Sequence, residues 1–187
     1  MIISYPIRSI LSLFFLLLLL FSLLNLSTLY QEISIKKQTI NETPVTIFEP
    51  KNDKIDNILV FIAHGFAGSS SFMKSIAISL ANTGYKVITY DFLGHGRHSK
   101  AYSGSITNEN GATQLFVEQT SDLTDYFLNK NEQYKLIIIG HSMASDIIFR
   151  VANTNDKFIG SIGVSNYTDQ IKKNEPDNVL IINGMWE

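Results

Sequence analysis

One uninterrupted apolar run constrains the fold of this 187-residue sequence more than any other feature. The run is "ILVFIAHG", residues 58–65, and it has the length of a strand. A strand with one wet face alternates apolar and polar residues, whereas a continuous apolar run predicts a strand that is covered on both faces. We therefore expect a buried, mostly parallel sheet at the centre of the molecule.

The segments on either side of this run alternate between strand and helix patterns. Residues 33–40 and 43–50 alternate around turn formers and predict an antiparallel hairpin. Further strands are expected at 85–91, 134–140, 158–166 and 178–184, and helices at 69–84, 112–131 and 142–154. In the first of these helices, Ser69 to Ser71 are N-cap candidates and Gly84 marks the end.

This order predicts one α/β domain over residues 31–187. It has a mostly parallel sheet, helices on both faces and an antiparallel hairpin at the edge. Right-handed crossovers place the carboxyl ends of the parallel strands along one rim, where α/β sheets bind ligands. The residues expected at that rim are His64, Asp91, Ser142, Ser165 and Gly184.

The N-terminal residues 1–30 predict a membrane-directed segment. From Ile10 to Leu29 there is no charged residue, and at ~1.5 Å per residue a helix of this length spans roughly 30 Å, about one hydrocarbon core. The length, and the poor small-residue cleavage site, favour an uncleaved single-pass anchor over a cleaved signal peptide. Arg8 precedes the span and Lys36 and Lys37 follow it, so the charge count is nearly balanced. We adopt the usual topology, with the domain on the extracytoplasmic side.

Composition excludes several classes of function. The formal net charge is −2, and the 15 basic residues are scattered, so no nucleic-acid partner is expected. The absence of cysteine excludes disulfides, thiolate-bound zinc and a cysteine nucleophile. No metal and no cofactor is expected.

Ser142 is the strongest candidate for a reacting residue. It lies in "IIIGHSMASDII", between an apolar strand pattern and an apolar helix pattern. A strand that turns into a helix so abruptly needs small residues two positions before and after the serine, and these are Gly140 and Ala144. The turn would present the hydroxyl above the sheet, with a helix N-terminus behind it to favour a developing oxyanion.

Three motifs in order resemble the α/β-hydrolase superfamily. They are "AHGFAGSS", "YDFLGHGRHS" and "GHSMAS", and they look like the group of lysophospholipases, monoacylglycerol lipases and serine aminopeptidases. The resemblance runs from about Ile33 to the last residue. It implies that Ser142 is the nucleophile and that the backbone N–H groups of Phe66 and Met143 form the oxyanion hole.

Other polar residues of these motifs have structural explanations. His64 is expected to bond the loop backbone, and Asp91 to cap the loop that follows its strand. His141 is expected to point away from Ser142 into the protein, and no partner is identified for His98. The glycines of the first motif lack the lysine of a phosphate-binding loop, so nucleotide binding is not expected.

The resemblance also implies a catalytic histidine and an orienting acid after the nucleophile. All four histidines precede Ser142, and the acid position falls on Glu187, the last residue. A last strand, a last helix and a histidine loop would follow there in the family pattern. The sequence therefore predicts either a truncated hydrolase or a natural variant without the triad. About a dozen residues join the last two predicted strands, so no cap domain is expected.

The sequence thus predicts a membrane-anchored serine hydrolase scaffold that acts on carboxylic ester, lipid or related acyl bonds, with weak or no activity in this form. Two alternatives stay open: a non-catalytic anchored binding module that uses the sheet rim, and acyl transfer in place of hydrolysis.

Overall fold

The computed structural model describes residues 5–52, 54–55, 57–103, 111–165 and 178–184. Within these residues seven strands form one sheet, in the order β1-β2-β4-β3-β5-β6-β7. The strands are β1 (Ile33–Ile40), β2 (Thr43–Pro50), β3 (Ile58–Ala63), β4 (Lys86–Tyr90), β5 (Lys135–His141), β6 (Phe158–Val164) and β7 (Val179–Ile182). Strands β3 to β7 pair in parallel, while β2 pairs antiparallel with both β1 and β4. The predicted mostly parallel sheet with an N-terminal hairpin is confirmed.

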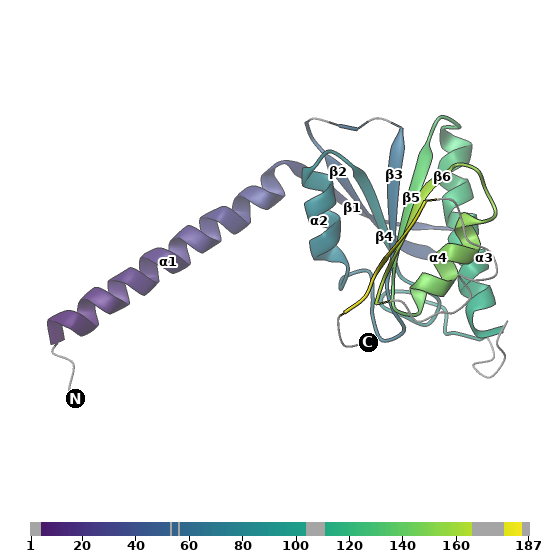
Figure 1. Ribbon diagram of the computed structural model, residues 1–187. Helices are drawn as coiled ribbons and strands as arrows, with labels where there is room; N and C mark the ends of the chain where they lie inside the picture. The colour runs from purple at the N-terminus through teal and green to yellow at the C-terminus, as the bar shows by residue number, and fades with distance from the viewer. Residues whose placement is uncertain (1–4, 53, 56, 104–110, 166–177, 185–187) are drawn as a thin grey trace.

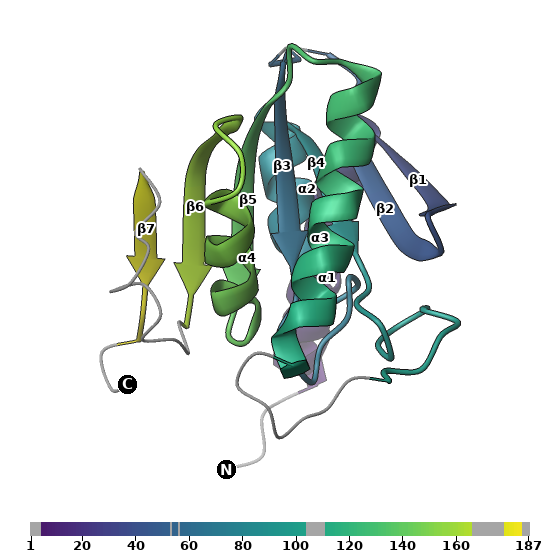
Figure 2. The same ribbon diagram turned by 90° about the vertical axis from the view of Figure 1, so that its right-hand side faces the viewer.

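Helices cover both faces of the sheet (Figure 2). Helix α2 (Lys74–Asn82) lies on one face, and α3 (Gly111–Lys130) and α4 (Ala144–Ala152) lie on the other. Alternate residues of β3 enter the two layers: Val60 packs in the cluster with α2, and Phe61 packs in the cluster with α3 and α4. Both side chains are almost fully buried, which is why this strand shows no polar residue.

The parallel strands end along one rim, as expected. His64 follows β3, Asp91 follows β4, Ser142 follows β5 and Ser165 follows β6. Residues that are tens of positions apart in sequence therefore lie at one edge of the sheet, and the candidate site lies there.

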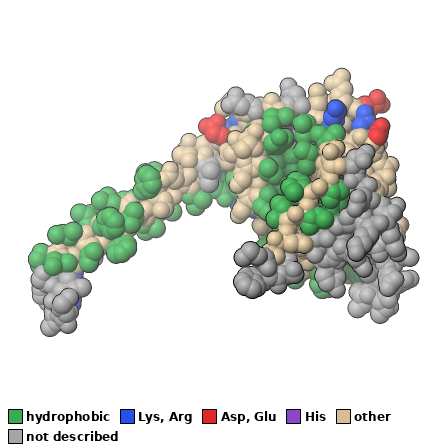
Figure 3. All heavy atoms as spheres, viewed as in Figure 1, with side chains coloured by type: hydrophobic (Ala, Val, Ile, Leu, Met, Phe, Trp, Pro, Cys, Tyr) green, Lys and Arg blue, Asp and Glu red, His purple; other side chains and the backbone are tan. Residues whose placement is uncertain are grey.

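Helix α1 (Tyr5–Gln31) leads away from the domain (Figure 1). Hydrophobic side chains cover it along its length (Figure 3), and its stretch Pro6–Thr28 has a mean hydropathy of 2.5 and no buried residue. A core helix of a soluble domain would be mostly buried. This is one N-terminal helix long and apolar enough to cross a membrane, and a signal sequence would have the same properties.

The prediction for the start of α2 was wrong. The helix begins at Lys74 after Met73, and no side chain caps it. The backbone N–H of Ser70 donates instead to the Asp91 carboxylate at 2.6 Å, which holds this segment as a loop. The predicted end is confirmed, because Gly84 has a left-handed φ of +99° and its N–H donates to the Ala81 carbonyl at 3.0 Å.

Two further predictions concern residues that the structure does not describe. The expected absence of a cap domain depends on the connection through 166–177, and the expected acid Glu187 lies at 185–187; both lie outside the described residues.

Candidate active site

Ser142 sits on a strained turn between β5 and α4. Its φ is +54°, a left-handed conformation that costs a residue with a Cβ ~1–2 kcal/mol. Two backbone hydrogen bonds hold the turn: the Ser142 N–H donates to the Val164 carbonyl of β6, and the Ser145 N–H donates to the Ser142 carbonyl, both at 2.9 Å. Strain that is held in this way is typical of functional residues.

The small residue before Ser142 is a steric requirement. A Cβ added to Gly140 would lie 2.5 Å from the Ala144 carbonyl oxygen and 3.0 Å from the Ile148 side chain. Helix α4 therefore packs directly on the end of β5. The explanation of Gly140 as a residue that permits a tight strand-to-helix turn is confirmed.

The loop after β3 meets Ser142 closely. A Cβ on Gly65 would lie 3.2 Å from the Ser142 Cβ and 3.0 Å from His141 Nδ1, so any larger residue would push the two loops apart by a few tenths of an ångström. Phe66 follows Gly65 on this loop, and Met143 follows Ser142. Among the residues that the structure describes, neither the Phe66 N–H nor the Met143 N–H has an intramolecular acceptor. Neither N–H is therefore engaged within that part of the chain.

A pocket of about 370 Å³ opens beside Ser142. Its walls include Phe66 and Phe72, whose side chains are 65% and 67% exposed. Large aromatic side chains with such exposure give the pocket an apolar mouth. The arrangement suits a ligand with a carbonyl group near Ser142 and an apolar substituent toward the two rings.

His141 corrects a prediction. It was expected to point into the protein, yet it is half-buried, lines the same pocket as Ser142, and its ring lies 5.7 Å from the ring of Phe72. The reason is the two-residue period of a strand: His141 shares its face of β5 with Ile137 and Ile139, and that face packs toward α2.

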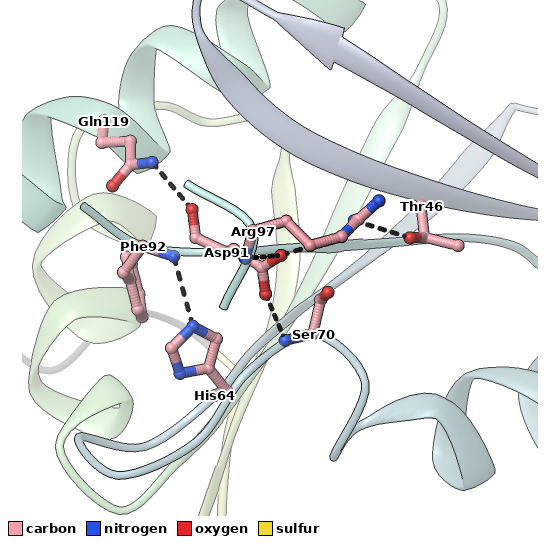
Figure 4. Close-up of polar contacts among 7 residues, drawn as sticks. All are labelled: Thr46, His64, Ser70, Asp91, Phe92, Arg97 and Gln119. Atoms are coloured by element: carbon pink, nitrogen blue, oxygen red, sulfur yellow. Dashed lines mark hydrogen bonds and ion pairs between the residues drawn. The ribbon is translucent and has the colours of Figure 1, made fainter. Parts of the chain in front are cut away.

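His64 has the structural role that its sequence position predicts. It is fully buried, and its Nε2 accepts the Phe92 N–H at 3.2 Å (Figure 4). Its Nδ1 lies 2.8 Å from the Gly65 carbonyl. Burial lowers the pKa of His64, so the ring is neutral near pH 7 and Nδ1–H is the donor to Gly65. The ring therefore connects the loop after β3 to the loop after β4 and supports the backbone that leads to Phe66.

Asp91 also connects the loop after β3 to the loop after β4. Its Oδ1 accepts the Ser70 N–H at 2.6 Å, and its Oδ2 accepts the Arg97 N–H at 3.1 Å and Arg97 Nε at 3.2 Å (Figure 4). Burial alone would raise the pKa of Asp91, but the hydrogen bonds and the guanidinium charge bring that pKa below its ordinary value. The loop-capping role of Asp91 is confirmed.

The structure adds partners that the sequence did not reveal. Gln119 of α3 donates to the Asp91 carbonyl at 3.1 Å and accepts the Leu93 N–H at 3.1 Å. His98 does have a partner, because its Nδ1 accepts the Lys100 N–H at 3.1 Å. A glutamine in a helix carries no sequence signal for such contacts, since only the packing of α3 brings it to this loop.

Within the described residues, no histidine and acid complete a catalytic triad with Ser142. No hydrogen bond joins a histidine to Ser142, and no group of three metal-ligating side chains is present in that part of the chain. The site consists of a strained serine, two backbone N–H groups without an acceptor in that part of the chain, and an apolar pocket.

Comparisons with known proteins show the family of this chain. Residues 53–181 match the family described as serine aminopeptidase, S33. The sn-1-specific diacylglycerol lipase ABHD11 of Danio rerio is 36% identical over 107 residues, which cover 57% of this chain and 29% of that protein. The chain thus spans less than a third of the length of this curated relative.

Solved structures share the fold. A serine hydrolase without lid from Xanthomonas campestris, XC6422, has a TM-score of 0.65 at 15% identity, covering 82% of this chain and 72% of that chain. A carboxyl esterase from Bacillus coagulans, in complex with glycerol, has a TM-score of 0.58 at 17% identity, covering 76% of this chain and 48% of that chain.

Proposed function

Because this chain belongs to the serine aminopeptidase S33 family of α/β hydrolases, we propose that it carries the nucleophile and the oxyanion hole of an esterase- or lipase-like serine hydrolase. The observation that carries the proposal is the left-handed Ser142 in the wall of the apolar pocket, together with the Phe66 and Met143 N–H groups that have no acceptor among the described residues. The proposal concerns Ser142, Phe66 and Met143, while Glu187 stays a prediction for the acid.

The proposed reaction proceeds through an acyl-enzyme. Ser142 Oγ attacks the ester carbonyl carbon, and the oxygen that becomes negative is bound by the N–H groups of Phe66 and Met143. The bond from the carbonyl carbon to the leaving alcohol breaks, and the serine proton leaves with that alcohol. Water then cleaves the acyl-serine bond and releases the carboxylic acid.

Substrates are proposed to be esters with an apolar acyl chain, lipids among them. Phe66 and Phe72 offer such a chain an exposed aromatic mouth. The relative from Danio rerio is named for diacylglycerol hydrolysis, which supports an ester lipid here.

The test is labelling of the 187-residue chain in uncharged detergent with a fluorophosphonate, together with hydrolysis of a p-nitrophenyl ester. No described histidine bonds Ser142, so we expect slow acylation that added imidazole accelerates, because imidazole can act as the missing general base. A positioned base contributes ~10²–10⁴-fold, and free imidazole should recover part of that range.

Ser142→Ala should abolish the labelling and its acceleration by imidazole, whereas Ser79→Ala, at an exposed position of α2, should leave both unchanged. Ester hydrolysis is compared after subtraction of the rate that imidazole alone produces in buffer. Equal labelling of wild type and Ser142→Ala would refute the assignment of the nucleophile. A folded chain with no imidazole-dependent acylation would instead support the non-catalytic binding module.

We also propose that α1 is retained as a single-pass anchor with the domain on the extracytoplasmic side. Its length and its fully exposed apolar surface support this assignment. N-terminal sequencing of the protein from isolated membranes tests retention, because a cleaved signal would remove the first residues. Protease protection in sealed vesicles tests the side.

A further inference from the structure

We propose that a second pocket, between α2 and the hairpin end of the sheet, binds an oxyanion of the phosphate type. The pocket is distinct from the one at Ser142 and has a volume of about 150 Å³. One water takes up ~30 Å³ in the liquid, so a tetrahedral anion and a few waters fit. The inference does not depend on the hydrolase assignment, because Ser142 does not line this pocket.

A row of three polar residues forms the floor. Lys37 of β1 pairs with Thr46 of β2, and Thr46 pairs with Thr89 of β4. Residues that are paired across strands point to the same face of the sheet, and all three line this pocket. A polar row on a face that otherwise packs apolar side chains against α2 needs an explanation.

Thr89 carries a buried hydroxyl without a hydrogen-bond partner in the described part of the chain. Its side chain is fully buried, and its Oγ1 has no hydrogen-bond partner among the residues that the structure describes. Leaving a buried hydroxyl unpaired costs ~1–3 kcal/mol, so such a group is expected to have a ligand or a water as its partner. Thr89 lines the pocket, so the proposed anion would accept its O–H once this side chain, which is shielded from solvent, turns toward the pocket.

Cationic side chains line the same pocket. Lys37, Lys74 and Arg97 all line the pocket, and no acidic side chain is among the described residues that do so. Arg97 is held in place, because its Nε bonds Asp91 Oδ2 and its Nη2 donates to Thr46 Oγ1 at 3.0 Å (Figure 4). Even if Asp91 offsets the charge of Arg97, the two lysines remain, and together they favour a ligand with negative charge.

The position of the pocket indicates where such an anion would come from. Lys74 lies 5.0 Å from the ring centre of Tyr30, near the end of the apolar helix α1. If α1 lies in a membrane, its C-terminal end brings this pocket toward the headgroup region, where phosphate groups are abundant. The shared chemistry is a phosphate oxyanion, supplied either by a lipid headgroup or by free phosphate.

Thermal unfolding of the 187-residue chain in uncharged detergent tests the site with inorganic phosphate. We expect the Tm to rise with phosphate and to saturate, with no such rise in chloride at the same ionic strength. Lys37→Met combined with Lys74→Met should abolish the rise. Lys36→Met is the matched control: Lys36 is next to Lys37 on β1, does not line the pocket, and pairs with Glu49 at 3.7 Å, so the rise should persist.

Thr89→Val distinguishes a binding site from a merely unsatisfied group. It should raise the Tm in chloride, because the unpaired hydroxyl is removed. It should also weaken phosphate binding about tenfold, equivalent to ~1.4 kcal/mol. An equal gain of Tm in chloride and in phosphate would overturn the proposal.

The same melting curves in phosphatidylcholine nanodiscs, with and without phosphatidic acid, identify the source. A rise with phosphatidic acid that depends on Lys37 and Lys74 but not on Lys36 assigns a lipid headgroup. A rise with inorganic phosphate alone assigns the free anion. No rise with either probe, or rises that survive in the double lysine variant, would refute the site.

Discussion

Ser142→Gly is expected to stabilise the protein while it removes the proposed nucleophile. Ser142 has a φ of +54°, and this conformation costs a residue with a Cβ ~1–2 kcal/mol. Glycine adopts it freely, but it also adds ~0.4–1 kcal/mol of entropy to the unfolded chain. The difference leaves a net gain of ~0.5–1 kcal/mol. For a chain of this size that gain corresponds to a Tm increase of ~1–4 °C.

The assay is urea unfolding in uncharged detergent, followed by circular dichroism, on the wild type and two variants at the same position. Ser142→Ala keeps the Cβ and therefore the strain, so it should unfold close to the wild type. Ser142→Gly should unfold at a higher urea concentration, and both variants should lose fluorophosphonate labelling.

A glycine at an ordinary helical position provides the control. Ser79 is exposed on α2, where glycine costs ~0.5 kcal/mol relative to serine, so Ser79→Gly should be destabilised. If Ser142→Gly and Ser142→Ala unfold together, the turn stores no conformational strain, and the reasoning that joins strain to function at this residue fails.

Three further predictions concern the framework of the site. Gly140→Ala should cost at least ~1–3 kcal/mol, because the new Cβ would meet the Ala144 carbonyl at 2.5 Å; an unchanged urea midpoint would contradict the tight packing of α4 on β5. Asp91→Asn should cost ~1.5–3 kcal/mol in the same assay, because one of the two carboxylate oxygens that accept from Ser70 and Arg97 becomes an NH₂ donor, while the partly exposed Arg97 stays hydrated. Burial lowers the pKa of His64, so below the ordinary pKa of 6.5 the unfolded state binds more protons than the folded state does. The stability from the neutral ring is therefore present above pH 6.5 and is lost as the pH falls through the folded-state pKa. His64→Gln keeps an acceptor for Phe92 and should flatten this loss of stability at low pH in a series of urea midpoints.

Local patterns were enough to predict most of the fold. The hairpin strands 33–40 and 43–50 are observed with those bounds, because alternating residues between turn formers fix both ends. The start of α2 was missed because a serine run also caps helices, and the sequence could not show that the Ser70 N–H would bond a carboxylate 21 residues away.

Part of the candidate site was likewise predictable from local sequence, and part was not. Ser142 and its small neighbour Gly140 were predictable, because a nucleophile turn is a local feature with its own spacing. The place of His141 and the partners of Asp91 were not predictable, since they depend on how loops from different strands meet at the rim.

The sequence by itself therefore determined the alternation of strands and helices, the apolar N-terminal helix and the serine turn, because each depends on residues within a few positions of one another. Only the tertiary structure decided that Gly65 brings a second loop against Ser142, that Phe72 and His141 share its pocket, and that Lys37, Thr46 and Thr89 form one polar row. These are contacts between distant segments, and they are fixed by strand order and register, which a linear pattern does not encode locally.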